Sequence, residues 1–392
     1  MIGKIKKIAS QTPIILVIGE LLCFYPFVLN QFLGLGSETT LLLIALAANI
    51  LLSFISKKKS NYGLPQVIKV CIIVQVALWT LYFPVHNDSS YITRLFFIAS
   101  SLILLLYLQN KNLLYQFADS YNKFILLMAL LGVPVFFAFA LGLWTPLSSF
   151  TNIDGRECYF FGLTFSNSIT AGICRVAGLF DEPGALAFWG IIAMIINKLF
   201  FDNKKIEIGL GLSLLTTLSA AYFVQITMYI ILFYKSNLKS IFVIVLLLGG
   251  VLFVSKTYLG GNEQLIYMTV DRFQGGEIRS QRNELSRETK KIFAESPIIG
   301  IGAQNFEQRG YFNDNPYEIL AKDGIIGFIV TYLPLLYVMF KYGKRNKKVL
   351  WATLILFAGY MQRPFHINLL HFFMFYLFCL LVYYKNEGYE KL

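Results

Sequence analysis

The stretch KFILLMALLGVPVFFAFALGLWT (123–145) carries a single charged side chain, that of Lys123, at its first position. A helix needs about twenty apolar residues to cross the hydrocarbon core of a bilayer, and this stretch is long enough. Similar runs recur along the whole chain of 392 residues, of which 56% are hydrophobic and 14% are charged. Soluble domains carry roughly a quarter charged residues, so the composition indicates a membrane protein with many spans.

The remaining apolar runs predict an all-α integral membrane protein with about twelve transmembrane helices, in which residues 1–392 form one domain. The predicted spans are roughly 12–32, 39–56, 67–85, 91–108, 123–145, 185–201, 206–218, 220–234, 241–257, 324–342, 349–362 and 367–384. The first span follows Lys4, Lys6 and Lys7 and shows no small-residue cleavage site. It is therefore typical of a signal anchor that stays in the protein.

The basic residues of the short connections favour one orientation of the chain in the membrane. They all fall on one face, which carries Lys4, Lys6, Lys7, Lys57, Lys58, Lys59, Lys111, Lys123, Lys198, Lys204, Lys205, Lys235, Lys239, Lys341, Lys344, Arg345, Lys347, Lys348, Lys385 and Lys391. The opposite connections 33–39 and 86–90 contain no lysine or arginine. Both termini are therefore expected in the cytoplasm. This placement also explains the net charge of +12, so a nucleic-acid partner is not expected.

Residues 206–233 are long for one crossing and short for two. A single crossing would place Lys235 and Lys239 on the outer face, against the orientation rule. We therefore expect two short legs that break near Thr216–Ser219, because a polar break in a membrane survives where protein buries it.

A short amphipathic segment precedes the stretch 123–145. Its apolar residues Leu113, Leu114, Phe117 and Tyr121 recur at helical spacing. This pattern predicts a separate helix that lies along the cytoplasmic interface.

Two long connections, 146–184 and 258–323, fall on the outer face, where we expect loops that contain short helices. In the second loop, residues 278–295 follow Gly275-Gly276 and stop before Pro297, which predicts an amphipathic helix. One face carries Arg279, Arg282 and Lys290, and guanidinium groups bind phosphate oxygens in a bidentate way. The alternative is a solvated helix of mixed charge, because Glu284 and Glu288 lie among the cations.

The first loop ends in RVAGLFDEPGALAFW (175–189), which places an arginine and two carboxylates at the start of an apolar helix. Arg175 is a candidate phosphate ligand, and Asp181 or Glu182 could accept a proton from a hydroxyl group. Alternatively, Glu182 and Pro183 only begin the following helix, since both residue types favour a first turn. The two interpretations are compatible, because a helix N-terminus also attracts anions.

Other ionisable residues lie within or near the predicted spans. Glu20 falls inside the first span, where a charge is costly and a functional role is the default interpretation. Arg94 and Arg363 lie near outer helix ends, from which they could contact a substrate or extend to lipid headgroups. His366 and His371 share no metal-type spacing with His86 or with any cysteine, so no metal site is expected.

The five cysteines fall into two groups. Cys23, Cys71 and Cys379 lie within predicted spans, where they are expected to pack as small apolar residues. Cys158 and Cys174 share the first outer loop, and in an oxidising compartment they could form a disulfide.

Four stretches together resemble a known family. They are RVAGLFDEP (175–183), SPIIGIGAQNF (296–306), NPYEILAKDGIIGF (315–328) and MQRPFHINLLHFFMFYLF (361–378). In this order the chain resembles the superfamily of O-antigen polymerases (Wzy-type) and O-antigen ligases over roughly 145–384. The resemblance implies a helical, metal-independent glycosyltransferase of the GT-C type in the bacterial inner membrane, with no cofactor.

The activity implied by the resemblance is polymerisation of a surface polysaccharide. The growing glycan would move from undecaprenyl pyrophosphate to the terminal sugar hydroxyl of a new lipid-linked repeat unit on the periplasmic face. The implied partners are these lipid-linked oligosaccharides, the lipid bilayer and a chain-length regulator. An O-antigen ligase, and a flippase or other transporter of the same lipid-linked sugar, remain as alternatives.

The resemblance also implies roles for individual residues. Arg175, Arg279 and Arg282 match arginines that bind pyrophosphate, where fixed cations would stabilise the leaving group. Asp314 stands before Asn315 where the ligases carry a histidine, which weakens the ligase alternative. The general base is then one of Glu182, Asp314 and His366, and the further substrate contacts expected are Arg94, Asn315, Tyr317 and Arg363.

Overall fold

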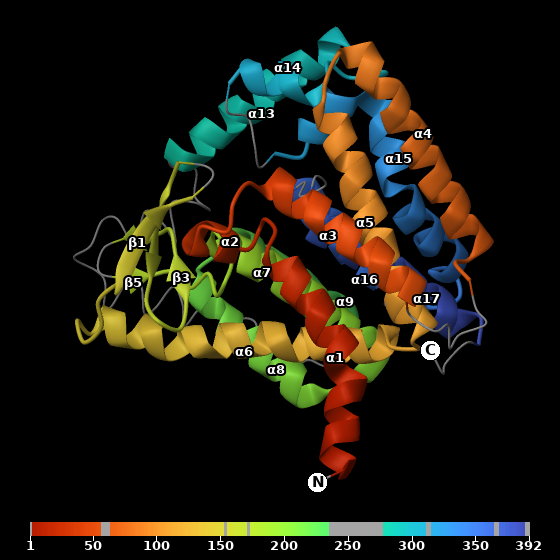
Figure 1. Ribbon diagram of the computed structural model, residues 1–392. Helices are drawn as coiled ribbons and strands as arrows, with labels where there is room; N and C mark the ends of the chain where they lie inside the picture. The colour runs from red at the N-terminus through yellow and green to blue at the C-terminus, as the bar shows by residue number, and fades with distance from the viewer. Residues whose placement is uncertain are drawn as a thin grey trace.

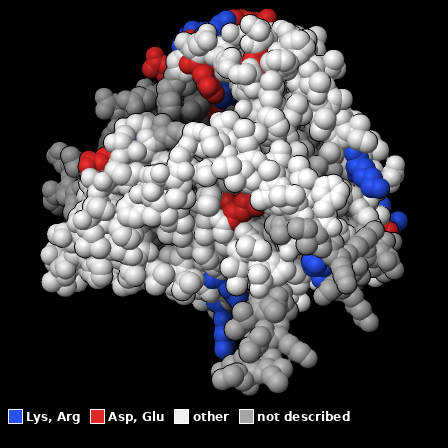
Figure 2. Space-filling model, in the orientation of Figure 1, with Lys and Arg blue, Asp and Glu red and all other residues white. Residues whose placement is uncertain are grey.

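The computed structural model describes residues 2–55, 63–152, 155–170, 173–234, 277–310, 315–363 and 368–388. Within them, six helices are long and apolar enough to cross a membrane: Gln66–His86, Ser90–Asn110, Leu114–Ala140, Pro183–Phe201, Glu318–Tyr342 and Leu369–Asn386. Figure 2 shows a broad surface that is mostly free of charged residues between charged edges of the molecule. The chain is therefore a helical membrane protein. The count of about twelve spans stays a prediction, and the expected span 241–257 lies outside the described residues.

The N-terminal helix α1 (Ile2–Leu22) ends earlier than expected, so the predicted single span 12–32 is wrong. After it the chain turns through Pro26, which cannot donate a helical hydrogen bond, into the short helix α2 (Leu29–Leu33). The turn pairs with the stretch before α7, because Phe27 forms a bridge to Phe180 and the two rings stack at 4.4 Å. Helix α3 (Glu38–Ile55) follows.

Helices α4 (Gln66–His86) and α5 (Ser90–Asn110) form a hairpin, and α6 (Leu114–Ala140) follows as one unbroken helix. The predicted interfacial helix at the start of α6 is therefore wrong. Leu114, Phe117 and Tyr121 are buried in the core, where Phe117 meets Phe373 edge to face at 5.0 Å. Their helical spacing reflects packing against other helices and not a face turned to lipid headgroups.

The loop 146–184, which was expected on the outer face, forms strands, and this corrects the expectation of short helices there. Strands β1 (Ser148–Thr151), β2 (Glu157–Phe160) and β3 (Phe165–Ser166) make an antiparallel sheet in the order β1-β2-β3. A second pair consists of β4 (Ile169–Thr170) and β5 (Ile173–Cys174). Aromatic and β-branched residues between Gly and Asn turns favour short strands over helices.

Helix α7 (Pro183–Ile196) continues as a π-helix, η1 (Asn197–Phe201), and is buried along its whole length. A helical hairpin follows. Its first leg consists of α8 (Lys204–Ser213) and the 3₁₀ turn η2 (Leu214–Thr217), and its second leg is α9 (Ala220–Tyr234). Leu218, with φ of 46°, marks the break between the legs. Tyr234 donates a hydrogen bond of 2.5 Å to Glu207, so both ends of the hairpin meet. The predicted break near Thr216–Ser219 is confirmed, and the crossing of the membrane by both legs stays a prediction.

The C-terminal part begins with α13 (Glu277–Glu295), which confirms the amphipathic helix expected over 278–295. Its apolar face packs through Ile292 against Phe306 of α14 (Ala303–Gln308) and Ala321 of α15 (Glu318–Tyr342). Helices α16 (Lys347–Gln362) and α17 (Leu369–Asn386) complete the bundle, and α17 is buried on nearly every side. Figure 1 shows the β-strands and α13 toward one side of the bundle and both termini toward the other.

Candidate functional site

The stretch before α7 is fixed by backbone hydrogen bonds to three distant segments, so the start of this helix has a defined position. The bonds run from Val28 to Leu179, from Arg175 to Ser168, from Val176 to Thr216, from Ala177 to Phe165 and from Asp181 to Pro26. Gly178 takes a φ of +64°, a conformation that glycine adopts without strain. The N-terminal turn, the sheet and the tip of the α8–α9 hairpin therefore meet around residues 175–182.

Glu182 lies at the N-cap of α7, directly before Pro183, but its carboxylate does not cap the helix. It forms ion pairs with Arg363, at the end of α16, and with Arg156, which precedes β2, at 3.5 Å. The side chain of Arg363 is 12% exposed and that of Glu182 is 15% exposed. Two guanidinium groups from distant parts of the sequence thus converge on one largely buried carboxylate.

Gly184 makes room for this arrangement. A methyl group at this position would overlap the guanidinium group of Arg363. Glycine at this position therefore allows the guanidinium group of Arg363 to lie against the first turn of α7. We name Arg156, Glu182 and Arg363 the outer charge cluster.

Arg175 lies beside this cluster in sequence, and its side chain contacts the hairpin tip. Its Nε donates a hydrogen bond of 2.9 Å to the carbonyl of Thr217, in the 3₁₀ turn that ends the first leg. The side chain is half-buried. Arg175 therefore stabilises the break between α8 and α9. Its role as a phosphate ligand stays a prediction.

The other predicted phosphate ligands and bases lie at the limits of the described residues. Arg279 and Arg282 belong to the N-terminal half of α13, and only their backbone is described. Asp314 and His366 lie outside the described residues. Their roles stay predictions.

Asn315 and Tyr317 connect α13 to the start of α15. The amide of Asn315 donates a hydrogen bond of 3.1 Å to Thr289, and its side-chain oxygen accepts one of 2.9 Å from the backbone of Tyr317. The ammonium group of Lys290 lies 4.6 Å from the centre of the Tyr317 ring. These contacts order the segment that the resemblance singles out.

Arg94 does not extend to lipid headgroups, because its side chain is 0% exposed. It forms a buried ion pair of 2.7 Å with Asp323, which also accepts a hydrogen bond of 2.8 Å from Tyr91. The partner acid was missed from the sequence, although its place directly before Gly324 in an apolar run was a signal. This cluster joins the α4–α5 hairpin to α15.

Two of the stretches that carry the family resemblance form one structural joint. Helix α15 is interrupted at Gly324, which has φ of 69° and ψ of −173°. The segment 296–306 crosses the interruption and donates hydrogen bonds to Ala321 and Lys322, while Pro297 and Ile298 accept them from residues after the break. Methyl groups at Gly300 or Gly324 would overlap the opposing backbone. The glycines of these stretches are therefore explained by close backbone contact.

Cys158 and Cys174 are both buried free thiols, so the predicted disulfide is absent. Cys158 belongs to β2 and Cys174 to β5, which are parts of different sheets. The Cys158 thiol contacts the carbonyl of Asp181 at 3.6 Å and the Cys174 thiol contacts the carbonyl of Arg175.

Comparisons with known proteins identified no relative of this chain. No family model, no curated protein and no solved structure matches the chain. Among the residues that the structure describes, no three His, Cys, Asp or Glu side chains gather in a way that could hold a metal ion.

Proposed function

We propose that this protein is a polysaccharide polymerase of the O-antigen type. It transfers a growing glycan from undecaprenyl pyrophosphate to the sugar hydroxyl of a lipid-linked repeat unit at the periplasmic face of the bacterial inner membrane. The observation that carries the proposal is the outer charge cluster, in which Glu182 lies between Arg156 and Arg363 at the start of a buried helix.

Electrostatics explains why this cluster suits a diphosphate. Guanidinium groups bind carboxylate and phosphate oxygens with the same geometry, so a phosphate can replace Glu182 between the two arginines. The low exposure of Arg363 strengthens its interaction with an anion, because water screens it less. As the sugar bond breaks, the departing diphosphate gains charge, and fixed cations stabilise it without a metal.

The same exchange gives Glu182 a role. When it is released from Arg363, its carboxylate can accept the proton of the attacking hydroxyl. Asp314 and His366 remain the other candidates for this base. Arg175, Arg279 and Arg282 are proposed as further phosphate ligands, and Figure 1 shows the N-terminal end of α13 pointing to the side of the β-strands.

The transporter alternative predicts ionisable groups near the middle of the membrane on broken helices. The hairpin 204–234 and α15 are both interrupted. However, Arg94 is close to the start of α5, and Asp323 to the start of α15. The outer charge cluster likewise involves helix ends, so a reaction at the membrane surface fits better than a pathway through it.

Deletion of the gene in its host separates the three activities. Loss of a polymerase leaves surface lipid carrying single repeats, loss of a ligase leaves long chains on the carrier lipid, and loss of a flippase leaves unextended carrier-linked repeats in the cytoplasmic leaflet. We expect single repeats, and we expect that complementation with Glu182→Gln or Arg363→Ala does not restore the long chains. The matched control is Arg309→Ala, which removes an exposed arginine paired with Glu295 outside the cluster and should restore them.

A further inference from the structure

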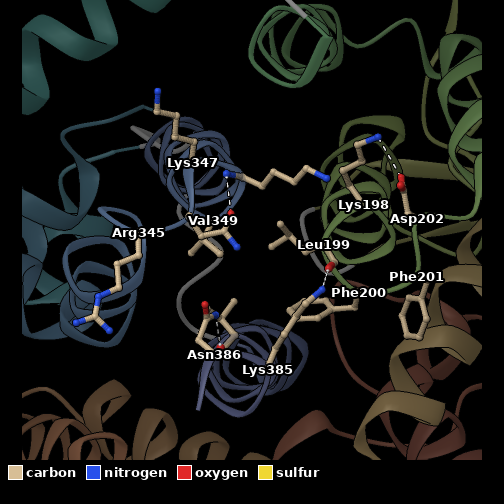
Figure 3. Close-up of a pocket in the computed structure, with 13 residues that line it drawn as sticks. Lys198, Leu199, Phe200, Phe201, Asp202, Arg345, Lys347, Val349, Lys385 and Asn386 are labelled. Atoms are coloured by element: carbon tan, nitrogen blue, oxygen red, sulfur yellow. Dashed lines mark hydrogen bonds and ion pairs between the residues drawn. The ribbon is translucent and has the colours of Figure 1, made fainter. Parts of the chain in front are cut away.

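A second polar site lies far from the outer charge cluster, at the end of the bundle where α7, α16 and α17 carry lysines. It is a pocket of about 670 Å³ between the π-helical end of α7, the α15–α16 connection and the last turn of α17. Figure 3 shows Leu199 and Val349 on opposite walls, with Lys385 extending to the backbone of Leu199. Its lining residues are Lys198, Leu199, Phe200, Phe201, Asp202, Arg345, Asn346, Lys347, Lys348, Val349, Val382, Lys385 and Asn386.

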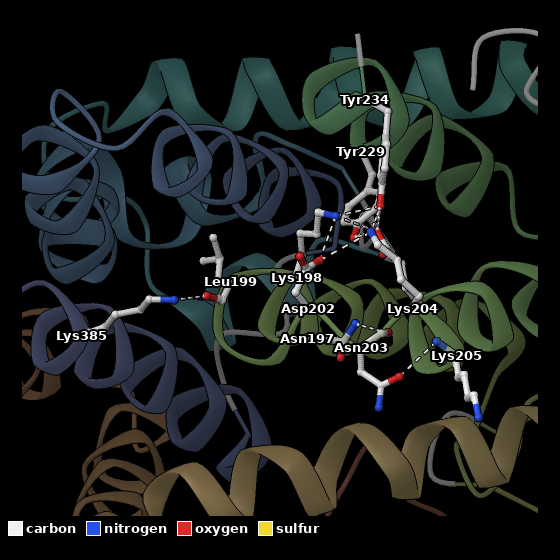
Figure 4. A network of polar contacts seen from close by, with 11 residues as sticks. Asn197, Lys198, Leu199, Asp202, Asn203, Lys204, Lys205, Tyr229, Tyr234 and Lys385 are labelled. Carbon is white, nitrogen blue, oxygen red and sulfur yellow. Dashed lines mark hydrogen bonds and ion pairs between the residues drawn. The ribbon is translucent and has the colours of Figure 1, made fainter. Parts of the chain in front are cut away.

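The only acidic residue of this lining, Asp202, is already paired. Its carboxylate lies 3.1 Å from the ammonium group of Lys198 and 3.5 Å from that of Lys204. Lys198 also contacts Glu207 at 3.4 Å and Tyr234 at 2.7 Å, and Figure 4 shows Lys198, Lys204 and Tyr234 pointing toward one another. The network therefore neutralises the acid and holds this wall of the pocket in place.

The opposite wall is cationic. The side chains of Arg345, Lys347 and Lys348 are exposed, and within the described ranges no carboxylate forms an ion pair with Lys347 or Lys348. The carboxylate of Glu387, which pairs with Lys341, also interacts with the charge of Arg345. They lie at the N-terminus of α16, where Asn346 accepts a hydrogen bond of 3.1 Å from the backbone of Lys348. The positive end of this helix adds to the charge of the side chains. The positive potential at this end of the pocket favours an anionic ligand.

The pocket also has an apolar part. Leu199, Phe200, Val349 and Val382 line it next to the cations, and Lys385 packs over the ring of Phe200 at 5.5 Å. Its volume is within the range of small-molecule sites, about 300–1,000 Å³. A pocket with basic residues at its entrance and apolar residues beside them suits a ligand in which a phosphate group is attached to a hydrocarbon chain.

We propose that this pocket binds the headgroup of an anionic phospholipid. The phosphate lies at the N-terminus of α16, near Lys347 and Lys348, and the glycerol and first methylene groups contact Leu199 and Val382. Arg345, which Figure 3 shows extending away from Lys347, adds to the positive potential there. A lipid is the source of the phosphate because the pocket is formed by the ends of membrane-spanning helices, where basic sites hold anionic headgroups. A soluble phosphate would gain nothing from the apolar wall. This inference is independent of the proposed glycan chemistry.

The test is native mass spectrometry of the purified full chain in detergent, titrated with phosphatidylglycerol or with zwitterionic phosphatidylcholine. We expect phosphatidylglycerol to bind at least tenfold more tightly. The triple variant Arg345→Gln/Lys347→Gln/Lys348→Gln should weaken its binding about tenfold. The matched control Lys69→Gln/Lys123→Gln/Lys205→Gln removes three exposed lysines that do not line the pocket and should change it less than twofold.

Further measurements distinguish a loss of charge from a loss of folding, and a lipid ligand from a soluble anion. Lys347→Arg/Lys348→Arg keeps the charge and should bind phosphatidylglycerol as the wild type does, and the thermal unfolding midpoint of the triple variant should stay unchanged. Equal binding of the two lipids, or equal weakening in the control variant, would overturn the proposal. Displacement of phosphatidylglycerol by millimolar inorganic phosphate would also overturn it, because the pocket would then be a site for a soluble anion.

Discussion

Asp323 holds Arg94 in an ion pair of 2.7 Å, and neither side chain has any exposed surface. Tyr91 and Trp79 complete the surroundings, since the guanidinium group lies 4.6 Å from the centre of the Tyr91 ring and 5.8 Å from that of Trp79. Buried charges of this kind persist only when they are paired and hydrogen-bonded. The pair therefore fixes the α4–α5 hairpin against α15.

Removal of either Arg94 or Asp323 should make the folded protein less stable. We expect Arg94→Ala or Asp323→Ala to lower the free energy of unfolding by about 3–5 kcal/mol, because each leaves an uncompensated buried charge. Thermal unfolding of the purified protein measures this, and Lys291→Ala, in an exposed pair with Glu288, is the control with an effect below about 1 kcal/mol. If Arg94→Ala keeps the wild-type unfolding midpoint and loses activity, Arg94 is a substrate contact instead.

The interruption of α15 should require glycine. Gly324→Ala places a methyl group against the carbonyl of Ile298 at a φ of +69°. The conformation alone costs about 1–3 kcal/mol, and the overlap adds to it. Gly19→Ala is the control, because a methyl group there meets nothing within 4 Å. Differential scanning fluorimetry should show a much lower unfolding midpoint for Gly324→Ala and an unchanged midpoint for Gly19→Ala. Equal midpoints for the two variants would contradict the close backbone contact at Gly324.

Docking of the segment 296–306 should depend on pH through Asp88. Burial raises the pKa of this carboxyl, but hydrogen bonds from the backbone of Gln304 and from Ser90 outweigh burial and lower it. The pKa is thus lower in the folded state than in the unfolded chain, where it is about 4. The stabilisation is present above that pH and is lost as the pH falls through the folded value.

Hydrogen exchange of residues 296–310 measures this dependence. Protection should fall as the pH is lowered from 6 to 3, after correction for the intrinsic exchange rate. Asp88→Asn should exchange faster at pH 6 and should remove most of the change with pH. A wild-type protection factor that is constant over this range contradicts the role of Asp88.

The two arginines of the outer charge cluster should contribute unequally. The side chain of Arg156 is 42% exposed and that of Arg363 is 12% exposed, so water screens the first more strongly. We expect Arg363→Ala to reduce polymer formation at least tenfold more than Arg156→Ala. The ratio of chain lengths on a surface-glycan gel measures this, with protein levels checked by immunoblot, and an equal loss would contradict the assignment.

Periodicity and charge were sufficient to predict much of the fold. The apolar runs located the long helices, and the lysines that follow residue 234 required the chain to return after Thr217, as it does. The first span was predicted too long, because its apolar composition continues past the end of α1 and through the turn at Pro26. The start of α6 was predicted wrongly, because helical spacing does not say whether an apolar face meets lipid or protein. The strands at 148–174 were missed because we expected helices in every outer loop.

The site was harder to predict, since its pairs are distant in sequence. Glu182 and Arg363 were both candidates, but no local pattern joins a helix start to the end of another helix 181 residues later. Arg156 was not a candidate at all, because an arginine after a loop glycine carries no signal. Asp323 was missed although it lies in a motif, because the stretch 315–328 was interpreted only as part of a family resemblance.

Reconstitution of the reaction from purified components tests whether this protein is a polymerase. The purified full-length protein is incubated with undecaprenyl-pyrophosphate-linked repeat units from its host, with a chelator and without any sugar nucleotide. We expect a ladder of lengthened lipid-linked glycans with the wild type and with Arg309→Ala, and only single repeats with Arg363→Ala. Single repeats with the wild type, or an equal ladder with Arg363→Ala, would contradict it.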